Sequence, residues 1–307
     1  NNDGDPDIVT AKHGLTIEDV KGLAYDDPKW DQLLEQVPVD EMVNLVSNGG
    51  WTTQSVPSIG KLNYVEVDGP NGINNIMAHT TGNQYCAQSV LACSWNTELA
   101  VRMGETFAKE AIAMDVAALY APAMNIHRSP FSGRNYEYYS EDGLHSGKMA
   151  AAEVQGMQSQ GVTPYCKHFA VNDQETNRDS GGLLTWVNEQ AMREVYLKGF
   201  EVAVKEGGSR GIMSSFNRLG VTNAAESYEL LTTVLREEWG FEGTVITDCI
   251  LQLSYVNIDR AIRAGNDLIL SLMGIQSPTD QTTGTTTGRQ ALRTATHNIL
   301  YASANSV

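Results

Sequence analysis

Residues 240–248, Gly-Phe-Glu-Gly-Thr-Val-Ile-Thr-Asp, carry the signal for one buried strand of a parallel sheet. Two glycines mark a turn, and the β-branched run that follows is typical of a strand covered on both faces. The strand ends on an acid, Asp248. In parallel α/β proteins the catalytic residues lie at the carboxyl ends of strands, so Asp248 is a candidate catalytic residue. Turn formation and helix capping are the commoner roles of such an Asp.

Similar strand-like runs recur along the chain, at 64–67, 88–92, 117–121, 165–169, 211–216 and 267–271. Helical patterns lie between most of them, at 98–113, 143–159, 189–206, 227–238 and 257–264, with a last one at 289–301. This alternation predicts βα units and a parallel sheet. About seven units in 307 residues favour a (β/α)8 TIM-like barrel, irregular or incomplete at its first strands. No Gly-x-Gly-x-x-Gly follows a strand, which argues against a dinucleotide fold.

The chain outside these units is expected to form an extension and one long loop. Residues 1–30 are polar and predict an N-terminal extension, with a short helix starting near residue 15. Apolar spacing over 30–46 predicts two helices divided at Pro38, and residues 31–307 then form the barrel domain. Residues 277–288 are rich in Thr and Gly and predict a mobile polar loop.

Composition excludes several classes of partner. Lys and Arg total 21 against 37 Asp and Glu, and a net charge of −16 argues against nucleic acid and anionic membranes. The sequence has no apolar run of membrane-spanning length and no signal-peptide core, so we expect a soluble chain, bacterial cytoplasmic or secreted. The four cysteines lie far apart and predict free thiols, without a metal site.

Polar residues follow the predicted strands and would meet at one rim of a barrel. They include Asp68, Arg134, Lys167, His168 and Asp248. Beside the alternative already given for Asp248, the others have ordinary roles too: Asp68 as a turn former, Arg134 as an ion-pair partner of a nearby acid such as Glu137, and Lys167 as a surface residue beside a hydrogen-bonded structural His168. Together they predict a site rich in hydrogen-bond partners for an uncharged, hydroxylated ligand. The scattered histidines and the lack of a Gly-rich phosphate loop argue against a metal ion or a phosphate cofactor.

An ordered set of motifs over residues 35–270 resembles glycoside hydrolase family 3, the family of β-glucosidases and related exo-acting β-glycosidases. The motifs are Asp68-Gly69-Pro70-Asn71-Gly72, Ser94-Trp95-Asn96, Gly133-Arg134-Asn135-Tyr136-Glu137-Tyr138-Tyr139-Ser140-Glu141-Asp142, Lys167-His168-Phe169-Ala170-Val171-Asn172, Met213-Ser214-Ser215-Phe216-Asn217 and the stretch 240–248. The closing segment 291–301 also resembles the helix that ends the barrel domain of this family.

The resemblance implies a retaining exo-β-glycosidase with β-glucosidase specificity and no cofactor. Asp248 would be the nucleophile that forms a covalent glycosyl-enzyme. The first sugar subsite would consist of Asp68, Arg134, Lys167, His168, Arg178 and Phe216. The cations Lys167 and Arg134 are expected to hold the pKa of Asp248 down, so that it stays ionised.

Several positions depart from the family pattern. Asn74 stands where an Arg is common, and Phe216 replaces a Tyr. Cys249 follows the nucleophile where many relatives carry Trp, so an aromatic platform for the next sugar is missing there. The Gly-His-Gly loop of the N-acetylglucosaminidase branch is also absent after Lys167-His168, which argues against that specificity.

The sequence offers a nucleophile without an evident general acid. By the resemblance, the acid/base residue would come from a second α/β-sandwich domain or a partner chain, and 307 residues leave no room for that domain. Two alternatives stay open beside the β-glucosidase. One is a fold relative with another substrate, such as a β-xyloside, and the other is a non-catalytic sugar-binding barrel.

Overall fold

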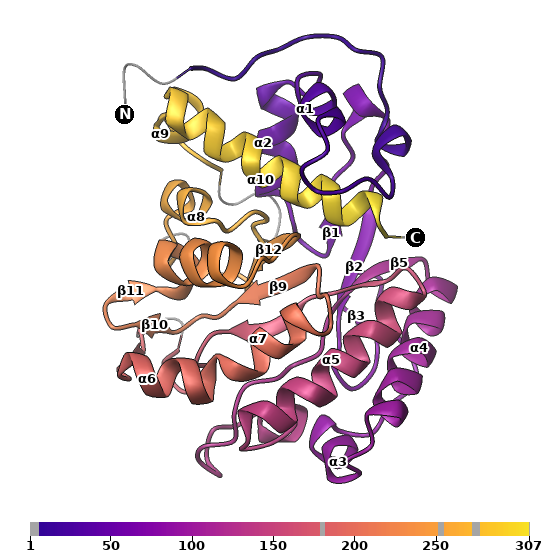
Figure 1. Ribbon diagram of the computed structural model, residues 1–307, viewed down its shortest axis with the longest axis vertical. Coiled ribbons are helices and arrows are strands. Elements are labelled where there is room, and N and C mark those ends of the chain that lie inside the picture. The colour runs from indigo at the N-terminus through magenta and orange to yellow at the C-terminus, as the bar shows by residue number, and fades with distance from the viewer. Residues whose placement is uncertain (1–5, 179–181, 251–254, 272–276, 307) are drawn as a thin grey trace.

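The computed structural model describes residues 6–178, 182–250, 255–271 and 277–306, with strands inside and most helices outside (Figure 1). The helices are α1 Lys29–Leu34, α2 Val39–Ser47, α3 Gln88–Cys93, α4 Thr97–Ala113, α5 Gly143–Ser159, α6 Glu189–Ala191, α7 Lys198–Lys205, α8 Ile258–Ala264, α9 Asp280–Thr283 and α10 Thr286–Ala304. Two π-helical segments span Met192–Tyr196 and Glu229–Glu238. The strands are β1 Thr52–Thr53, β2 Tyr64–Asp68, β3 Asn74–Asn75, β4 Thr80–Thr81, β5 Val116–Tyr120, β6 Thr163–Pro164, β7 Cys166–Phe169, β8 Leu184–Thr185, β9 Gly211–Ser214, β10 Arg218–Leu219, β11 Thr222–Asn223 and β12 Thr244–Thr247.

Two parallel groups of strands form the centre of the molecule. In the first, β5 lies between β2 and β6, and β1, β3 and β4 extend this sheet antiparallel. In the second, β9 lies between β7 and β12. An isolated parallel bridge between Ala123 and Lys167 links the two groups, and a second one joins Ile246 to Leu268. The small sheet of β8, β10 and β11 lies apart from them.

The predicted α/β class is confirmed, whereas the predicted TIM-like barrel is not. The strands of the described residues form three sheets, and none of these closes on itself. Residues 88–92 were expected to be a strand and form helix α3, in which the buried Gln88, Leu91 and Ala92 recur at helical spacing. The predicted strand 267–271 contributes only the isolated bridges of Leu268 and Ser271.

The predicted polar loop 277–288 is wrong in part, because it contains α9 and the first turn of α10. Threonines supply the helix caps: Thr279 Oγ1 accepts a hydrogen bond from Gln281 N, and Thr285 Oγ1 from Gly288 N, both at 3.2 Å. Asp259 on α8 fixes this segment by accepting hydrogen bonds from the hydroxyls of Thr279 and Thr282. The Thr-rich composition therefore serves helix capping.

Strand β12 forms as the sequence predicts. Its residues Thr244–Thr247 are all buried, and it pairs in parallel register with β9 along its whole length. Gly243 precedes it with φ +157°, and a Cβ at this position would lie 2.1 Å from the carbonyl oxygen of Arg210. Only glycine allows the chain to pass so close to its neighbour, so this residue sets the start of the strand that delivers Asp248.

The N-terminal segment packs into the same core as the end of the chain. Ile17 and Val20 of a short 3-10 turn belong to one hydrophobic cluster with Trp30 of α1 and Leu292 of α10. In Figure 1 the long helix α10 lies across α1 and α2. The predicted division into an extension and a barrel domain stays a prediction. Within the described residues, no helix has the length and apolar character needed to span a membrane.

A buried acid on α5 makes stability depend on pH. Burial raises the pKa of Glu153 from its ordinary 4.5 to about 7, although the hydrogen bond from the Tyr139 hydroxyl opposes this. The folded chain therefore binds this proton more tightly than the unfolded chain does. The resulting stabilisation is complete below pH 4.5 and is lost as the pH rises through about 7.

We predict that Glu153→Gln flattens this pH dependence. Glutamine keeps the shape of the side chain and cannot ionise, so the variant should exceed the parent in unfolding free energy at pH 8 by on the order of 3 kcal/mol. Urea unfolding at pH 5 and pH 8 measures the effect, with Glu105→Gln on α4 as the control. An equal pH slope in the parent and the Glu153 variant would contradict the prediction.

Candidate active site

The carboxyl ends of three central strands bring charged residues together. Asp68 ends β2, Lys167 and His168 lie on β7, and Asp248 directly follows β12. Lys167 Nζ lies 2.6 Å from Asp68 Oδ1, and the lysine side chain is only 3% exposed. A lysine is buried in this way only when a partner compensates its charge, and Asp68 is that partner.

Asp248 lies between a histidine and an arginine. Its Oδ2 is 3.7 Å from His168 Nε2 and 3.5 Å from Arg178 Nη1. Burial lowers the pKa of His168 well below its ordinary value, and Arg134, Lys167 and Arg178 lower it further. The imidazole is therefore neutral, and its contact with Asp248 is not an ion pair. Arg178 is the cation that directly faces this carboxylate.

The remaining predicted site residues surround Arg178. Its guanidinium lies over the Phe216 ring, 4.8 Å from the centroid, and its Nε is 3.0 Å from Glu175 Oε2. Arg134 Nη1 lies 3.8 Å from the same carboxylate oxygen, and Arg134 also pairs with the buried Glu137. The structure thus brings together every residue predicted for the site, and the ion pair of Arg134 with Glu137 expected as its ordinary role is present too.

Two residues that support the site had no role predicted from the sequence. Asn125 exchanges two hydrogen bonds of 2.8 Å with the backbone of His168 and thereby fixes this residue. The Tyr255 hydroxyl donates to the carbonyl oxygens of Arg178, at 2.5 Å, and of Phe216. Tyr255 lies outside every recognised motif, and hydrogen bonds to backbone carbonyls require no particular residue at the partner position. The sequence therefore holds no signal for this contact.

The expected low pKa of Asp248 is wrong in direction. Burial raises the pKa of this carboxyl above its ordinary value, and the charges of Arg178, Arg134 and Lys167 offset this only in part. The pKa of Asp68 is lowered, because its pair with Lys167 and the charge of Arg134 together outweigh the effect of burial. The surroundings thus shift the pKa values of the two carboxyls in opposite directions, and Asp68 is the more readily ionised.

The thiol next to Asp248 is predicted to react slowly. Burial raises the pKa of Cys249 to about 11, and Asp248 and Asp68 raise it in the same direction. Since the thiolate is the reactive species, iodoacetamide at pH 7.5 should modify the exposed Cys86 and Cys93 before Cys249. Mass spectrometry of peptides sampled over time measures this order. Modification of Cys249 first would contradict it.

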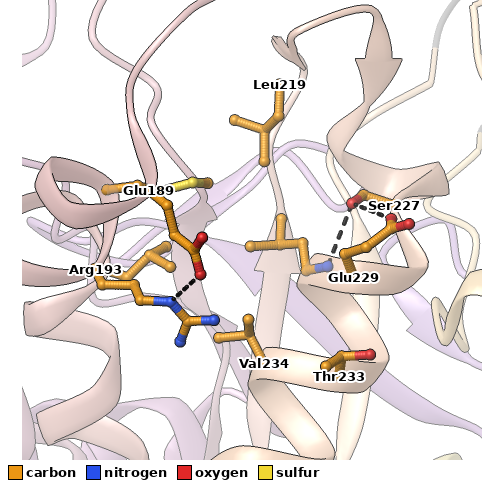
Figure 2. Close-up of a pocket in the computed structure, with 10 residues that line it drawn as sticks. Glu189, Arg193, Leu219, Ser227, Glu229, Thr233 and Val234 are labelled. Carbon is orange, nitrogen blue, oxygen red and sulfur yellow. Dashed lines mark hydrogen bonds and ion pairs between the residues drawn. The ribbon is translucent and has the colours of Figure 1, made fainter.

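A well-formed pocket of the described residues lies elsewhere. A hollow of about 430 Å³ is formed between the π-helical segment Met192–Tyr196, β10 and the segment Glu229–Glu238. Figure 2 shows Leu219 and Val234 facing it, with Glu189 and Arg193 paired at its edge. None of the residues gathered around Asp248 lines this pocket. Its size alone therefore does not make it the candidate site.

An α/β domain with a polar site at the carboxyl ends of parallel strands has the architecture of an enzyme. The sequence profile of the glycosyl hydrolase family 3 N-terminal domain matches residues 54–282. The chain belongs to this family.

Similar proteins carry glycosidase names. β-Glucosidase A of Butyrivibrio fibrisolvens is 36% identical over 271 residues, which cover 87% of this chain and 31% of the relative. An exo-α-(1→6)-L-arabinopyranosidase of Bifidobacterium longum is 38% identical over 226 residues, 70% of this chain and 30% of the relative. The structure of β-glucosidase 3B from Thermotoga neapolitana in complex with glucose has a TM-score of 0.81 at 36% identity, and the match covers 91% of this chain and 43% of that one. The chain thus spans about a third of the length of these curated relatives.

Proposed function

We propose that this chain carries the nucleophile and the first sugar subsite of a retaining exo-β-glucosidase. The observation that carries the proposal is the position of Asp248, which is half-buried beside Arg178 and a neutral His168, in a chain of glycosyl hydrolase family 3. The substrate would be a β-glucoside or an oligosaccharide with a terminal non-reducing β-D-glucosyl residue. We further infer that the two linked parallel sheets are the core of an incomplete (β/α)8 barrel.

The chemistry follows from the roles of the two carboxyls. An oxygen of Asp248 attacks the anomeric carbon and forms a glycosyl ester, while the bond to the leaving oxygen breaks. Arg178 stabilises the ionised form of Asp248 before the attack. Asp68, held by Lys167, accepts hydrogen bonds from sugar hydroxyls, and Lys167, Arg134 and His168 offer donors. Water then attacks the same carbon, the bond from this carbon to the Asp248 oxygen breaks, and the sugar leaves with its original configuration while the carboxylate is restored.

We propose that the acid/base residue comes from a second domain or a partner chain. A retaining enzyme needs a second carboxyl about 5–5.5 Å from the nucleophile, protonated when the leaving group departs. The Glu175 carboxyl is already occupied by contacts with Arg178, Arg134 and the Asn172 amide. Asp68 has a lowered pKa. Neither of these two carboxyls is therefore suited to donate a proton, and the relatives are long enough to contain a further domain.

A trapping experiment tests the assignment. A 2-deoxy-2-fluoro-β-glucoside with a dinitrophenolate leaving group needs little acid assistance, and its glucosyl-enzyme hydrolyses slowly. We expect the complete enzyme to gain the mass of one fluoroglucosyl group, located on the peptide that contains Asp248. A label on another residue would refute the role of Asp248. No label, together with saturable glucose binding, would favour the sugar-binding barrel.

The sugar specificity needs a separate measurement. A relative named for α-L-arabinopyranoside cleavage is as similar to this chain as the β-glucosidases are. Arabinopyranosides and xylosides lack the hydroxymethyl group of glucose, so a panel of aryl glycosides separates these classes. We expect the aryl β-glucoside to have the highest kcat/KM. A higher value for the β-xyloside or the α-L-arabinopyranoside would replace this part of the proposal.

A further inference from the structure

Tyr136 is an exposed aromatic residue on a turn that is fixed on both sides. The residue is 59% exposed, although it lies in the 3-10 turn Asn135–Glu137. Its neighbour Asn135 donates a hydrogen bond of 2.8 Å to the Ser129 carbonyl, and its other neighbour, Glu137, is buried and paired with Arg134. Because this backbone is already held, binding a ligand to the ring requires little further ordering.

Helix α3 places this turn beside the loop that follows Asp68. The Ser89 hydroxyl donates a hydrogen bond of 3.2 Å to the carbonyl of Tyr136. The preceding residue, Gln88, donates one of 2.5 Å to the carbonyl of Pro70. Two consecutive side chains of one helix thus hold Tyr136 and the segment just after Asp68, so Tyr136 lies at the border of the candidate site.

Electrostatics agree with this position. Partial burial raises the pKa of Tyr136, and the charges of Glu137, Asp68 and Glu175 add to this while Arg134 opposes it. The charges that act on the phenol thus come from the candidate site and its border, while most of the residue faces solvent.

We propose that Tyr136 is the specificity-determining residue for the leaving-group sugar, a proposal that rests on the proposed β-glucosidase activity. A pyranose presents a face of C–H groups that packs on an aromatic ring, and its hydroxyls pair with a phenol. Cys249, beside the nucleophile, has a small neutral thiol and no ring for such stacking. The ligand class is thus a second pyranose, as in a β-linked glucosyl disaccharide.

The test compares a substrate that has a leaving-group sugar with one that has none. In the complete enzyme, Tyr136→Ala should lower kcat/KM for cellobiose about 3- to 10-fold more than for β-glucosyl fluoride. Tyr136→Phe keeps the ring and should lose less of this selectivity. Tyr228→Ala is the matched control, since Tyr228 is 50% exposed, follows the turn Ala224–Glu226 and makes none of the contacts described around Asp248.

The outcomes separate this proposal from the one on which it rests. If Tyr136→Ala lowers kcat/KM for both substrates by the same factor, or for neither of them, Tyr136 does not select the leaving group. If Tyr228→Ala changes the ratio as much as Tyr136→Ala does, the effect is not specific to this position and the proposal is overturned. If the unaltered enzyme acts on neither substrate, the β-glucosidase activity itself fails, and the role of Tyr136 fails with it.

Discussion

Replacing Asp248 with asparagine is expected to lower kcat/KM for an aryl β-glucoside on the order of 10⁴-fold or more. The amide is a poor nucleophile, so the glucosyl-enzyme no longer forms, while its shape keeps the contacts with Arg178 and His168. The KM of any residual activity should change little, because the loss lies in the chemical step. Steady-state kinetics of the complete enzyme, with circular dichroism to verify folding, measure the effect.

An external nucleophile distinguishes a lost nucleophile from a damaged fold. In Asp248→Ala the removed carboxylate leaves room for azide. Azide would attack the anomeric carbon from the face that Asp248 attacks in the parent enzyme, and would give α-glucosyl azide from an activated β-glucoside. Asp173→Asn is the matched control, because this half-buried carboxyl lies five residues after His168 and its Oδ1 has no hydrogen-bond partner among the described residues. Formation of β-glucosyl azide, or an equal loss in Asp173→Asn, would contradict the role of Asp248.

The pH profile should reflect the surroundings of Asp248. Its pKa is raised by burial, and only the ionised carboxylate can attack. For a substrate with an activated leaving group, kcat/KM should therefore fall as the pH drops, starting above the ordinary range of an Asp. Arg178→Met should move this acid limb to higher pH, since Arg178 is the largest influence that lowers this pKa. An unchanged limb would show that another group controls it.

The sequence predicts most strongly where local pattern and chemistry agree. Strand β12 and helix α5 form where the β-branched run and the helical spacing predict them. The grouping of Asp68, Lys167 and Asp248 could also be predicted, because parallel strands deliver their carboxyl ends to one edge. Whether the sheet closes into a barrel could not be predicted, since closure depends on which distant strands of the chain pair with each other. Helix α3 was missed because a short apolar run fits a strand and a helix equally well.

Electrostatic properties were harder to predict than positions. The sequence shows that cations accompany Asp248, but the degree of burial appears only in the folded chain. Burial outweighs those cations and reverses the expected direction of the pKa. Arg178 also proves to be the cation in contact with Asp248, at 3.5 Å, where Lys167 and Arg134 were expected. Lys167 instead forms its ion pair with Asp68.

The pair of Lys167 with Asp68 carries the second large expected effect. Lys167→Met keeps the length of the buried stem but removes the ammonium group, so Asp68 loses its partner and the sugar a hydrogen-bond donor. Because the side chain of Asp68 is 41% exposed, water compensates part of this loss. We expect kcat/KM to fall about 10- to 100-fold, which corresponds to about 1.4 to 2.7 kcal/mol.

A double-mutant cycle separates the contribution of the contact between Lys167 and Asp68 from the contributions of the two individual residues. If the two residues act as a unit, the double variant Asp68→Asn with Lys167→Met should lose much less transition-state stabilisation, measured from kcat/KM, than the sum of the losses in the two single variants. The pKa of Asp68 should rise in Lys167→Met, because the largest influence that lowers it is removed. The acid limb of kcat/KM would then move to higher pH for any substrate whose binding needs the Asp68 carboxylate. The contrary result is that the losses in the two single variants add up in the double variant, with unfolding free energies unchanged in all three. Lys167 and Asp68 would then contact the sugar independently, and their 2.6 Å contact would not organise the subsite.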